Sequence, residues 1–257
     1  MDIGVQGLRA LVTGGSKGLG LATATVLAKE GATVTINARD APRLRAAADS
    51  IGGFATAGDL HDPEAPAAIV AEAARLMGGL DLLVCNAGGP PAGPFESFGE
   101  QAWANAVDLS FMSAVRLVKA ALPYLRKSRH ASVLFVASYS VKQPIPGLVL
   151  SNAVRAATVG LSKSLALELG AEGIRFNSIL PGWTETERVG DLLGARAKAN
   201  GTTVDEEMAK QMQDCPLGRM ATPQEFANAA TFLLSPAASY ITGVALTVDG
   251  GMYKGTL

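Results

Sequence analysis

The sequence predicts a single α/β domain in which a doubly wound parallel sheet lies between two layers of helices, a three-layer α/β/α arrangement. Short apolar or β-branched runs alternate with longer helical segments along the chain. The 257 residues suit one large domain, and 48% of them are hydrophobic, enough for a large core. A glycine-rich turn joins the first predicted strand to the first predicted helix.

The first βαβ unit is the clearest part of the pattern. Residues 8–13 form an apolar run typical of a buried strand, and residues 18–30 form an Ala/Leu-rich helix that Gly31 ends. Residues 33–37 are β-branched and give the second strand.

The same alternation continues to the C-terminus. Further strands are expected at residues 54–56, 80–84, 132–136, 175–179 and 245–248. Helices are expected at residues 41–50, 63–77, 103–125 and 151–169. Strands that alternate with helices in this way form parallel sheets with right-handed crossovers, so the whole of residues 1–257 is expected to be one domain.

Residues 183–216 are the one irregular region. The segment follows a Pro-Gly pair and contains Asn200 and Gly201 between two helix-like pieces. A long excursion in a compact domain is more often a substrate lid than disorder, and a lid is expected here.

Composition excludes several classes of function. The formal net charge is −1 and no long Lys/Arg run occurs, which argues against nucleic acid or an anionic membrane as a partner. No leader-like segment and no apolar stretch long enough to span a bilayer occur, so a cytoplasmic protein is expected. Cys85, Cys215, His61 and His130 stand apart from one another in the sequence, and no metal site is expected.

The turn after the first strand predicts a phosphate site. Residues 13–20 read TGGSKGLG and lead directly into a helix, so free backbone N–H groups and the positive helix end face one point. Glycines at Gly14, Gly18 and Gly20 allow the tight turn and the close approach of a pyrophosphate. This arrangement is typical of a Rossmann-type dinucleotide site.

Further motifs carry a resemblance that spans nearly the whole chain. TGGSKGLG is similar to the TGxxxGxG motif of short-chain dehydrogenases/reductases, and Cys85-Asn86-Ala87-Gly88 is similar to their NNAG. The segments GIRFN (173–177), PGWT (181–184), TG (242–243) and VDGG (248–251) follow in the order of that family. The chain therefore resembles a divergent member of the short-chain dehydrogenase/reductase family.

The resemblance implies a set of cofactor-binding residues. It assigns the phosphates and the neighbouring ribose to the glycine turn, the adenine to the end of the third strand, the adenosine ribose to the NNAG-like segment, and the nicotinamide to the PGWT segment. The implied residues are Gly14, Ser16, Lys17, Gly18, Leu19, Gly20, Asp59, Leu60, Asn86, Ala87, Gly88, Pro181, Gly182 and Thr184. For Asp59, a role at the start of the next helix is the alternative.

Charge near the second strand favours NADP over NAD. An NAD site usually has a carboxylate after this strand, whereas a 2′-phosphate needs a cation. Here Ala38 and Arg39 follow the strand and Lys17 lies in the phosphate turn. Asp40 is the complication, because it could pair with Arg39.

The positions that carry catalysis in the family hold other residues. The resemblance implies a serine at Ser138, which is present, a tyrosine where Ser151 stands, a lysine where Arg155 stands and an asparagine where Ser110 stands. A serine hydroxyl is a much weaker acid than a phenol. A guanidinium can bond ribose hydroxyls but does not readily give up a proton.

Tyr139, next to Ser138, is the best substitute proton donor, although packing behind the site is an equally good interpretation. The leading hypothesis is an NADP-dependent oxidoreductase that acts on a small-molecule carbonyl or secondary alcohol. The alternatives are a non-redox isomerase, dehydratase or lyase, and an inactive cofactor-binding subunit. The resemblance also implies a homotetramer built through the helices at residues 103–125 and 151–169.

Overall fold

A seven-stranded parallel sheet forms the centre of the part of the chain that the computed structural model describes, residues 2–256. The strand order is β3-β2-β1-β4-β5-β6-β7, so the chain first builds outward from β1 on one side and then on the other. The strands are β1 (Arg9–Val12), β2 (Thr33–Ala38), β3 (Phe54–Ala57), β4 (Leu82–Cys85), β5 (Ser132–Val136), β6 (Arg175–Pro181) and β7 (Ala245–Val248). The predicted fold class is confirmed.

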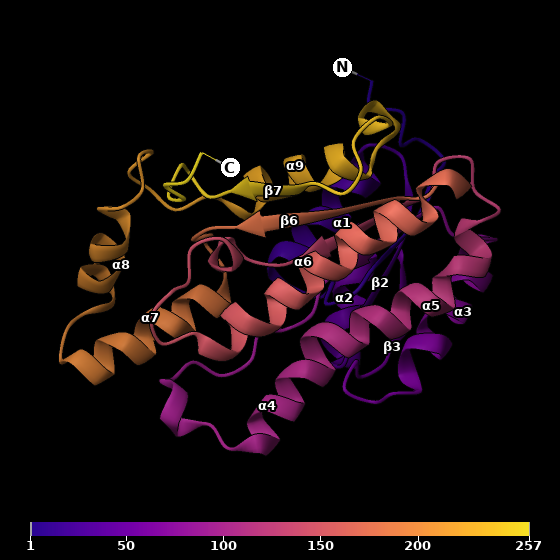
Figure 1. The fold of residues 1–257 in the computed structure, drawn as a ribbon. Helices are drawn as coiled ribbons and strands as arrows, with labels where there is room; N and C mark the ends of the chain where they lie inside the picture. The colour runs from indigo at the N-terminus through magenta and orange to yellow at the C-terminus, as the bar shows by residue number, and fades with distance from the viewer. Residues whose placement is uncertain (1, 257) are drawn as a thin grey trace.

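Helices cover both faces of the sheet, and Figure 1 shows α5 and α6 on one side of it with α1 and α2 on the other. One layer consists of α1 (Gly18–Lys29), α2 (Ala41–Ser50) and α9 (Pro223–Leu234). The other consists of α3 (Ala65–Met77), α5 (Ser113–Leu125) and α6 (Val149–Leu169). Strands covered on both faces need continuous apolar runs, and every residue of β4 and β5 is buried.

The helix expected at residues 103–125 is interrupted. α4 (Glu100–Val107) leads into a π-helical turn, η2 (Asp108–Met112), before α5 begins. A π turn weakens the regular carbonyl pairing of the helix, and α6 supplies a replacement donor, because Thr158 Oγ1 donates to the Ser110 carbonyl at 3.1 Å. The break lies at Ser110, one of the predicted catalytic positions.

The irregular segment contains the two expected helical pieces. α7 (Glu187–Asn200) ends at Gly201, whose φ of 66° is left-handed, and α8 (Val204–Met212) begins with a capping box between Thr203 and Glu206. Figure 1 shows both helices beyond the ends to which the β6 and β7 arrows point. Short 3-10 turns complete the chain: η1 (Phe95–Ser97), η3 (Tyr139–Val141), η4 (Gly170–Glu172) and η5 (Pro236–Ala238).

Within residues 2–256, no helix combines the length and the apolar character that crossing a membrane requires. The same residues contain no group of three or more His, Cys, Asp or Glu side chains placed to hold a metal ion.

Candidate active site

The carboxyl ends of the parallel strands bring the predicted motifs to one edge of the sheet. β1 leads into the glycine turn, β4 into Asn86, β5 into Ser138 and β6 into Gly182. Because these strands pair in parallel, the four segments lie at the same edge. This edge is where open α/β sheets bind their ligands.

The glycine turn is packed so closely that side chains cannot enter it. Gly14 and Gly18 have φ of 57° and 55°, and a Cβ at Gly20 would lie 2.3 Å from the Gly14 carbonyl oxygen. Asn86 Nδ2 donates to the carbonyls of Thr13 and Gly14, each at 3.2 Å, and so ties β4 to the turn. Two segments that the resemblance assigned to the cofactor are thus in contact.

The start of α1 is open to an anion. Its N-cap residue is Lys17, which makes no side-chain cap, and no acidic residue lies in the first turn. The first N–H groups of a helix have no partner within it, so an uncapped start of this kind suits a phosphate. Gly88 faces open space, which leaves room beside the turn.

Three cationic side chains lie around the end of β2. Two charged residues of this region, Arg43 and Glu187, were not predicted from the sequence. Arg39 pairs with Asp59 at 3.7 Å, and both are exposed. Lys17 Nζ lies 2.5 Å from Glu187 Oε2, and Arg43 Nη1 lies 3.5 Å from the same oxygen. Arg43 follows the helix-starting Asp40, whose side chain accepts from the Arg43 N–H, and this local pattern could have drawn attention to it.

Ser138 follows the end of β5, and Arg155 is bonded to the backbone just before it. The Ser138 hydroxyl accepts a hydrogen bond from the Ser140 N–H at 3.2 Å, which orients it at the start of η3. Arg155 Nη1 donates to the carbonyls of Val136 at 2.8 Å and Ala137 at 3.2 Å. Burial lowers the pKa of Arg155 to about 10, and the nearby charge of Arg188 acts in the same direction.

Ser151 and Ser110 approach Arg155 from two helices. Ser151 lies four residues before Arg155 on α6, so the two share a helix face. Ser110 and Arg155 line a narrow cavity of about 10 Å³, together with Thr13, Leu60, Cys85, Asn86, Ala87, Ser113, Ala114, Leu117, Val136 and Thr158. The Ser110 hydroxyl is buried and has no hydrogen-bond partner among the described residues.

Tyr139 lies in an apolar cluster at the same edge. Its side chain is buried with Trp183, Leu193 and Met252, which come from the segment after β6, from α7 and from the chain after β7. Burial raises the pKa of the Tyr139 phenol, and the adjacent Trp183 side chain and the charge of Arg196 partly oppose this. The ring therefore packs as a core residue does, while its hydroxyl lies near polar groups.

Arginines of α7 attach it to the other loops at this edge. Arg188 Nη2 donates to the Pro90 carbonyl at 2.6 Å, and Arg196 Nη2 donates to the Pro146 carbonyl at 3.4 Å. Those two loops are themselves joined, since the Gly93 N–H donates to the Gly147 carbonyl at 2.7 Å. The 183–216 segment thus covers the edge through side-chain contacts.

The segment is anchored at its start. A Cβ at Gly182 would lie 2.7 Å from the Asp249 Cα, and Thr184 is buried and bridges to Ala221. Thr186 caps α7 and lies against the glycine turn near Gly18.

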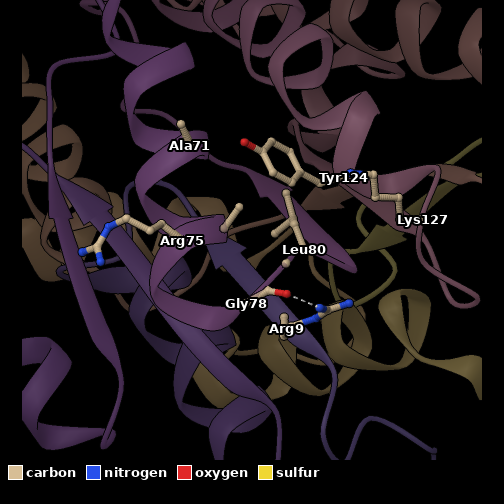
Figure 2. Close-up of a pocket in the computed structure, with 9 residues that line it drawn as sticks. Arg9, Ala71, Arg75, Gly78, Leu80, Tyr124 and Lys127 are labelled. Carbon is tan, nitrogen blue, oxygen red and sulfur yellow. Dashed lines mark hydrogen bonds between the residues drawn. The ribbon is translucent and has the colours of Figure 1, made fainter.

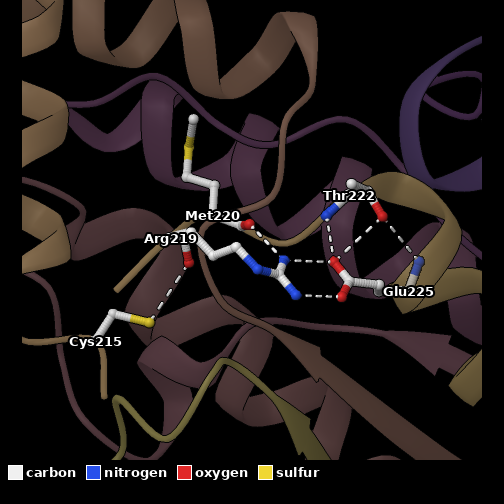
Figure 3. Close-up of polar contacts among 5 residues, drawn as sticks. All are labelled: Cys215, Arg219, Met220, Thr222 and Glu225. Atoms are coloured by element: carbon white, nitrogen blue, oxygen red, sulfur yellow. Dashed lines mark hydrogen bonds and ion pairs between the residues drawn. The ribbon is translucent and has the colours of Figure 1, made fainter. Parts of the chain in front are cut away.

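Beyond the segment, Figure 3 shows Arg219 paired through two nitrogens with Glu225 in the first turn of α9. The pairing lowers the pKa of the Glu225 carboxyl to about 2.

A larger cavity of about 370 Å³ lies elsewhere, at the amino ends of β1 and β4, and Figure 2 shows its lining. Two of the cationic side chains that line it already have partners. Arg9 bonds Asp81 and the Gly78 carbonyl, and Arg75 pairs with Glu72. None of the predicted site residues lines this cavity, so the carboxyl edge is the candidate active site.

The chain is similar to known proteins over nearly its full length. Residues 14–253 match the family model described as enoyl-(acyl carrier protein) reductase. The chain is 33% identical over 251 residues to 3-oxoacyl-(acyl-carrier-protein) reductase FabG of Vibrio cholerae, covering 97% of this chain and 98% of that protein.

Two solved structures are also similar. One is L-sorbose reductase of Gluconobacter frateurii in complex with NADPH and L-sorbose, with a TM-score of 0.93, 34% identity and coverage of 99% and 100% of the two chains. The other is an NADPH-bound short chain oxidoreductase of Pseudomonas aeruginosa PAO1 that contains an atypical catalytic center. Its TM-score is 0.87 and its identity 36%, covering 96% of this chain and 97% of that one.

Proposed function

Because the chain belongs to the short-chain dehydrogenase/reductase family, we propose that it is an NADPH-dependent oxidoreductase that reduces a small carbonyl compound or oxidises a secondary alcohol at an atypical catalytic site. The observation that carries the proposal is the placement of Ser138, Arg155 and the glycine turn at the same edge of the sheet. Neighbours that bind NADPH, one of them with an atypical catalytic center, support it.

The residues of this chain fit a dinucleotide. The closely packed glycines allow a pyrophosphate to approach the backbone, and the uncapped start of α1 favours a negative charge. Lys17, Arg39 and Arg43 lie around the end of β2, and Asn37 and Ala38 offer no carboxylate there. This charge pattern favours NADP over NAD. When bound, the nicotinamide supplies or accepts the hydride.

The chain's own residues then act on the substrate oxygen. Ser138 and Arg155 are the groups that we assign to stabilising negative charge on that oxygen, and Arg155 also carries the charge that would meet the nicotinamide ribose. Tyr139 is the proton donor in this proposal, and Ser151 is at most a hydrogen-bond donor. The 183–216 segment would act as the lid that excludes water.

A double substitution tests the atypical site. In Ser151→Tyr/Arg155→Lys, the tyrosine and lysine return to the positions where the family carries them, four residues apart on α6. We expect the wild type to oxidise NADPH with members of a carbonyl panel, and the double variant to shift its pH profile because a different acid donates the proton.

One pattern of activities would overturn the proposal. A wild type that binds NADPH but is inactive on the whole panel, beside an active double variant, would point to a non-redox enzyme or to an inactive cofactor-binding subunit.

The surface supports a homo-oligomer, and we propose a tetramer. On α6, Leu167 is 76% exposed, and Tyr240, just before the edge strand β7, is fully exposed. Large apolar side chains in such positions are typical of subunit contacts. A monomeric mass in light scattering at micromolar concentration would contradict this proposal.

A further inference from the structure

The carboxylate of Glu187 occupies a position between two cations of the proposed phosphate site. Glu187 Oε2 lies 2.5 Å from Lys17 Nζ and 3.5 Å from Arg43 Nη1. The three side chains come from the first residue of α7, the glycine turn and the first turn of α2. Each is about half exposed, so solvent or a ligand can reach all of them.

Both cations lie at the point where β1 and β2 leave the sheet. Lys17 is the N-cap residue of α1, and Arg43 lies five residues beyond the end of β2. The two strands are neighbours, and the turn is bonded to β2 because the Gly15 N–H donates to the Asn37 carbonyl at 2.9 Å. The proposed function places the 2′-phosphate of NADPH at this point.

A phosphate and the Glu187 carboxylate would compete for the same donors. Lys17 and Arg43 can form charge-assisted hydrogen bonds to either anion, but a phosphate carries more charge and more acceptor oxygens. Once the phosphate is bound, Glu187 faces a like charge and loses its partners. NADH lacks the 2′-phosphate and would leave the Glu187 contacts in place.

The position of Glu187 couples this competition to the lid. Thr186 caps α7 and its Cγ2 lies 3.6 Å from the place of a Cβ on Gly18, so the start of α7 rests on the glycine turn. Displacing Glu187 therefore loosens the end of α7 that contacts the cofactor site. Farther along the helix, the contact from Arg196 to the Pro146 carbonyl does not depend on this pairing.

We propose that Glu187 is an internal competitor of the 2′-phosphate, a carboxylate that holds Lys17 and Arg43 until the phosphate replaces it and that frees the start of α7 when NADPH, but not NADH, binds. This inference rests on the proposed use of NADPH. It adds that this competition distinguishes the two cofactors.

The test uses nucleotide fragments that do not react. Binding of 2′,5′-ADP and of 5′-ADP is measured by calorimetry at low salt for the wild type, for Glu187→Gln and for the control Asp191→Asn, which removes an exposed charge from the same helix. We expect Glu187→Gln to bind 2′,5′-ADP about threefold to fivefold more tightly, the range for releasing an exposed ion pair. Binding of 5′-ADP should change by less than about twofold, and added salt should reduce the gain.

A second measurement reads the lid directly. Hydrogen exchange at residues 187–190 of the wild type should be faster with NADPH bound than with NADH bound, and Glu187→Gln should remove this difference. Unchanged 2′,5′-ADP binding in Glu187→Gln, or an equal gain for both fragments, overturns the inference while leaving the proposed function intact. A wild type that binds neither NADPH nor 2′,5′-ADP overturns both.

Discussion

Replacing Tyr139 by phenylalanine tests the proton donor with the least disturbance to the fold. The ring is buried among Trp183, Leu193 and Met252, and phenylalanine fills the same volume. Loss of one hydroxyl costs about 1 kcal/mol of folding free energy, so the variant should fold. If the phenol donates the proton, turnover should fall about a hundredfold or more, which corresponds to about 2.7 kcal/mol in the activation barrier.

The assay is NADPH oxidation with a carbonyl panel, together with a fluorescence titration of NADPH. Nucleotide affinity should not change, because the expected effect lies in the chemical step. Tyr124→Phe, at the amino edge of the sheet, is the matched control and should retain full turnover.

The pH profile gives an independent check. Burial raises the pKa of Tyr139, so the donor stays protonated from neutrality to above about pH 10 and carbonyl reduction should not decline over that range through loss of this proton. Alcohol oxidation needs the phenolate and should rise with pH. Turnover of Tyr139→Phe within about threefold of the wild type would refute the assignment and leave Tyr139 as a packing residue.

Three further substitutions test other parts of the site. Arg39→Asp should weaken NADPH binding by at least about tenfold, about 1.4 kcal/mol, and NADH binding far less, whereas the exposed Arg45→Asp on α2 should do neither; equal losses for both cofactors in a titration would contradict this. Gly20→Ala should abolish nucleotide binding and lower the melting temperature, because its Cβ would lie 2.3 Å from a backbone oxygen, and Gly160→Ala, which meets nothing within 4 Å, should not. Glu207 is bonded by Lys210 and has a pKa lowered to about 2, so its contribution to stability is present above pH 4.5 and is lost as pH falls toward 2. Glu207→Gln should flatten the fall in melting temperature over that interval, and an unchanged pH profile would count against this role.

The sheet could be predicted because its signal is local. Strands covered on both faces need uninterrupted apolar runs, and residues 132–136 were expected with the bounds that β5 has. The glycine turn was predictable for a similar reason, since its close packing excludes any side chain at Gly20. The buried strands and the glycine turn each depend on residues within one short stretch of sequence.

The features that were missed depend on distant partners. The π turn at Ser110 changes the apolar pattern of the helix little. The Ser110 carbonyl accepts a hydrogen bond from Thr158, which lies on another helix. The pairing of Lys17 with Glu187 joins residues 170 positions apart, which no periodic pattern reveals. By contrast, α9 was overlooked although its capping box, Thr222 with Glu225 three residues later, stands in the sequence.

The bonds from Arg155 to the end of β5 have a consequence for substitutions at this position. One nitrogen of the guanidinium serves two carbonyls where the strand leaves the sheet, so the side chain stabilises the backbone as well as offering charge to a ligand. A lysine ends in a compact ammonium on a shorter, differently shaped side chain, so a change to lysine alone would shift or lose these bonds and cost stability. We therefore expect substitution of Arg155 alone to destabilise the fold more than substitution of Ser151.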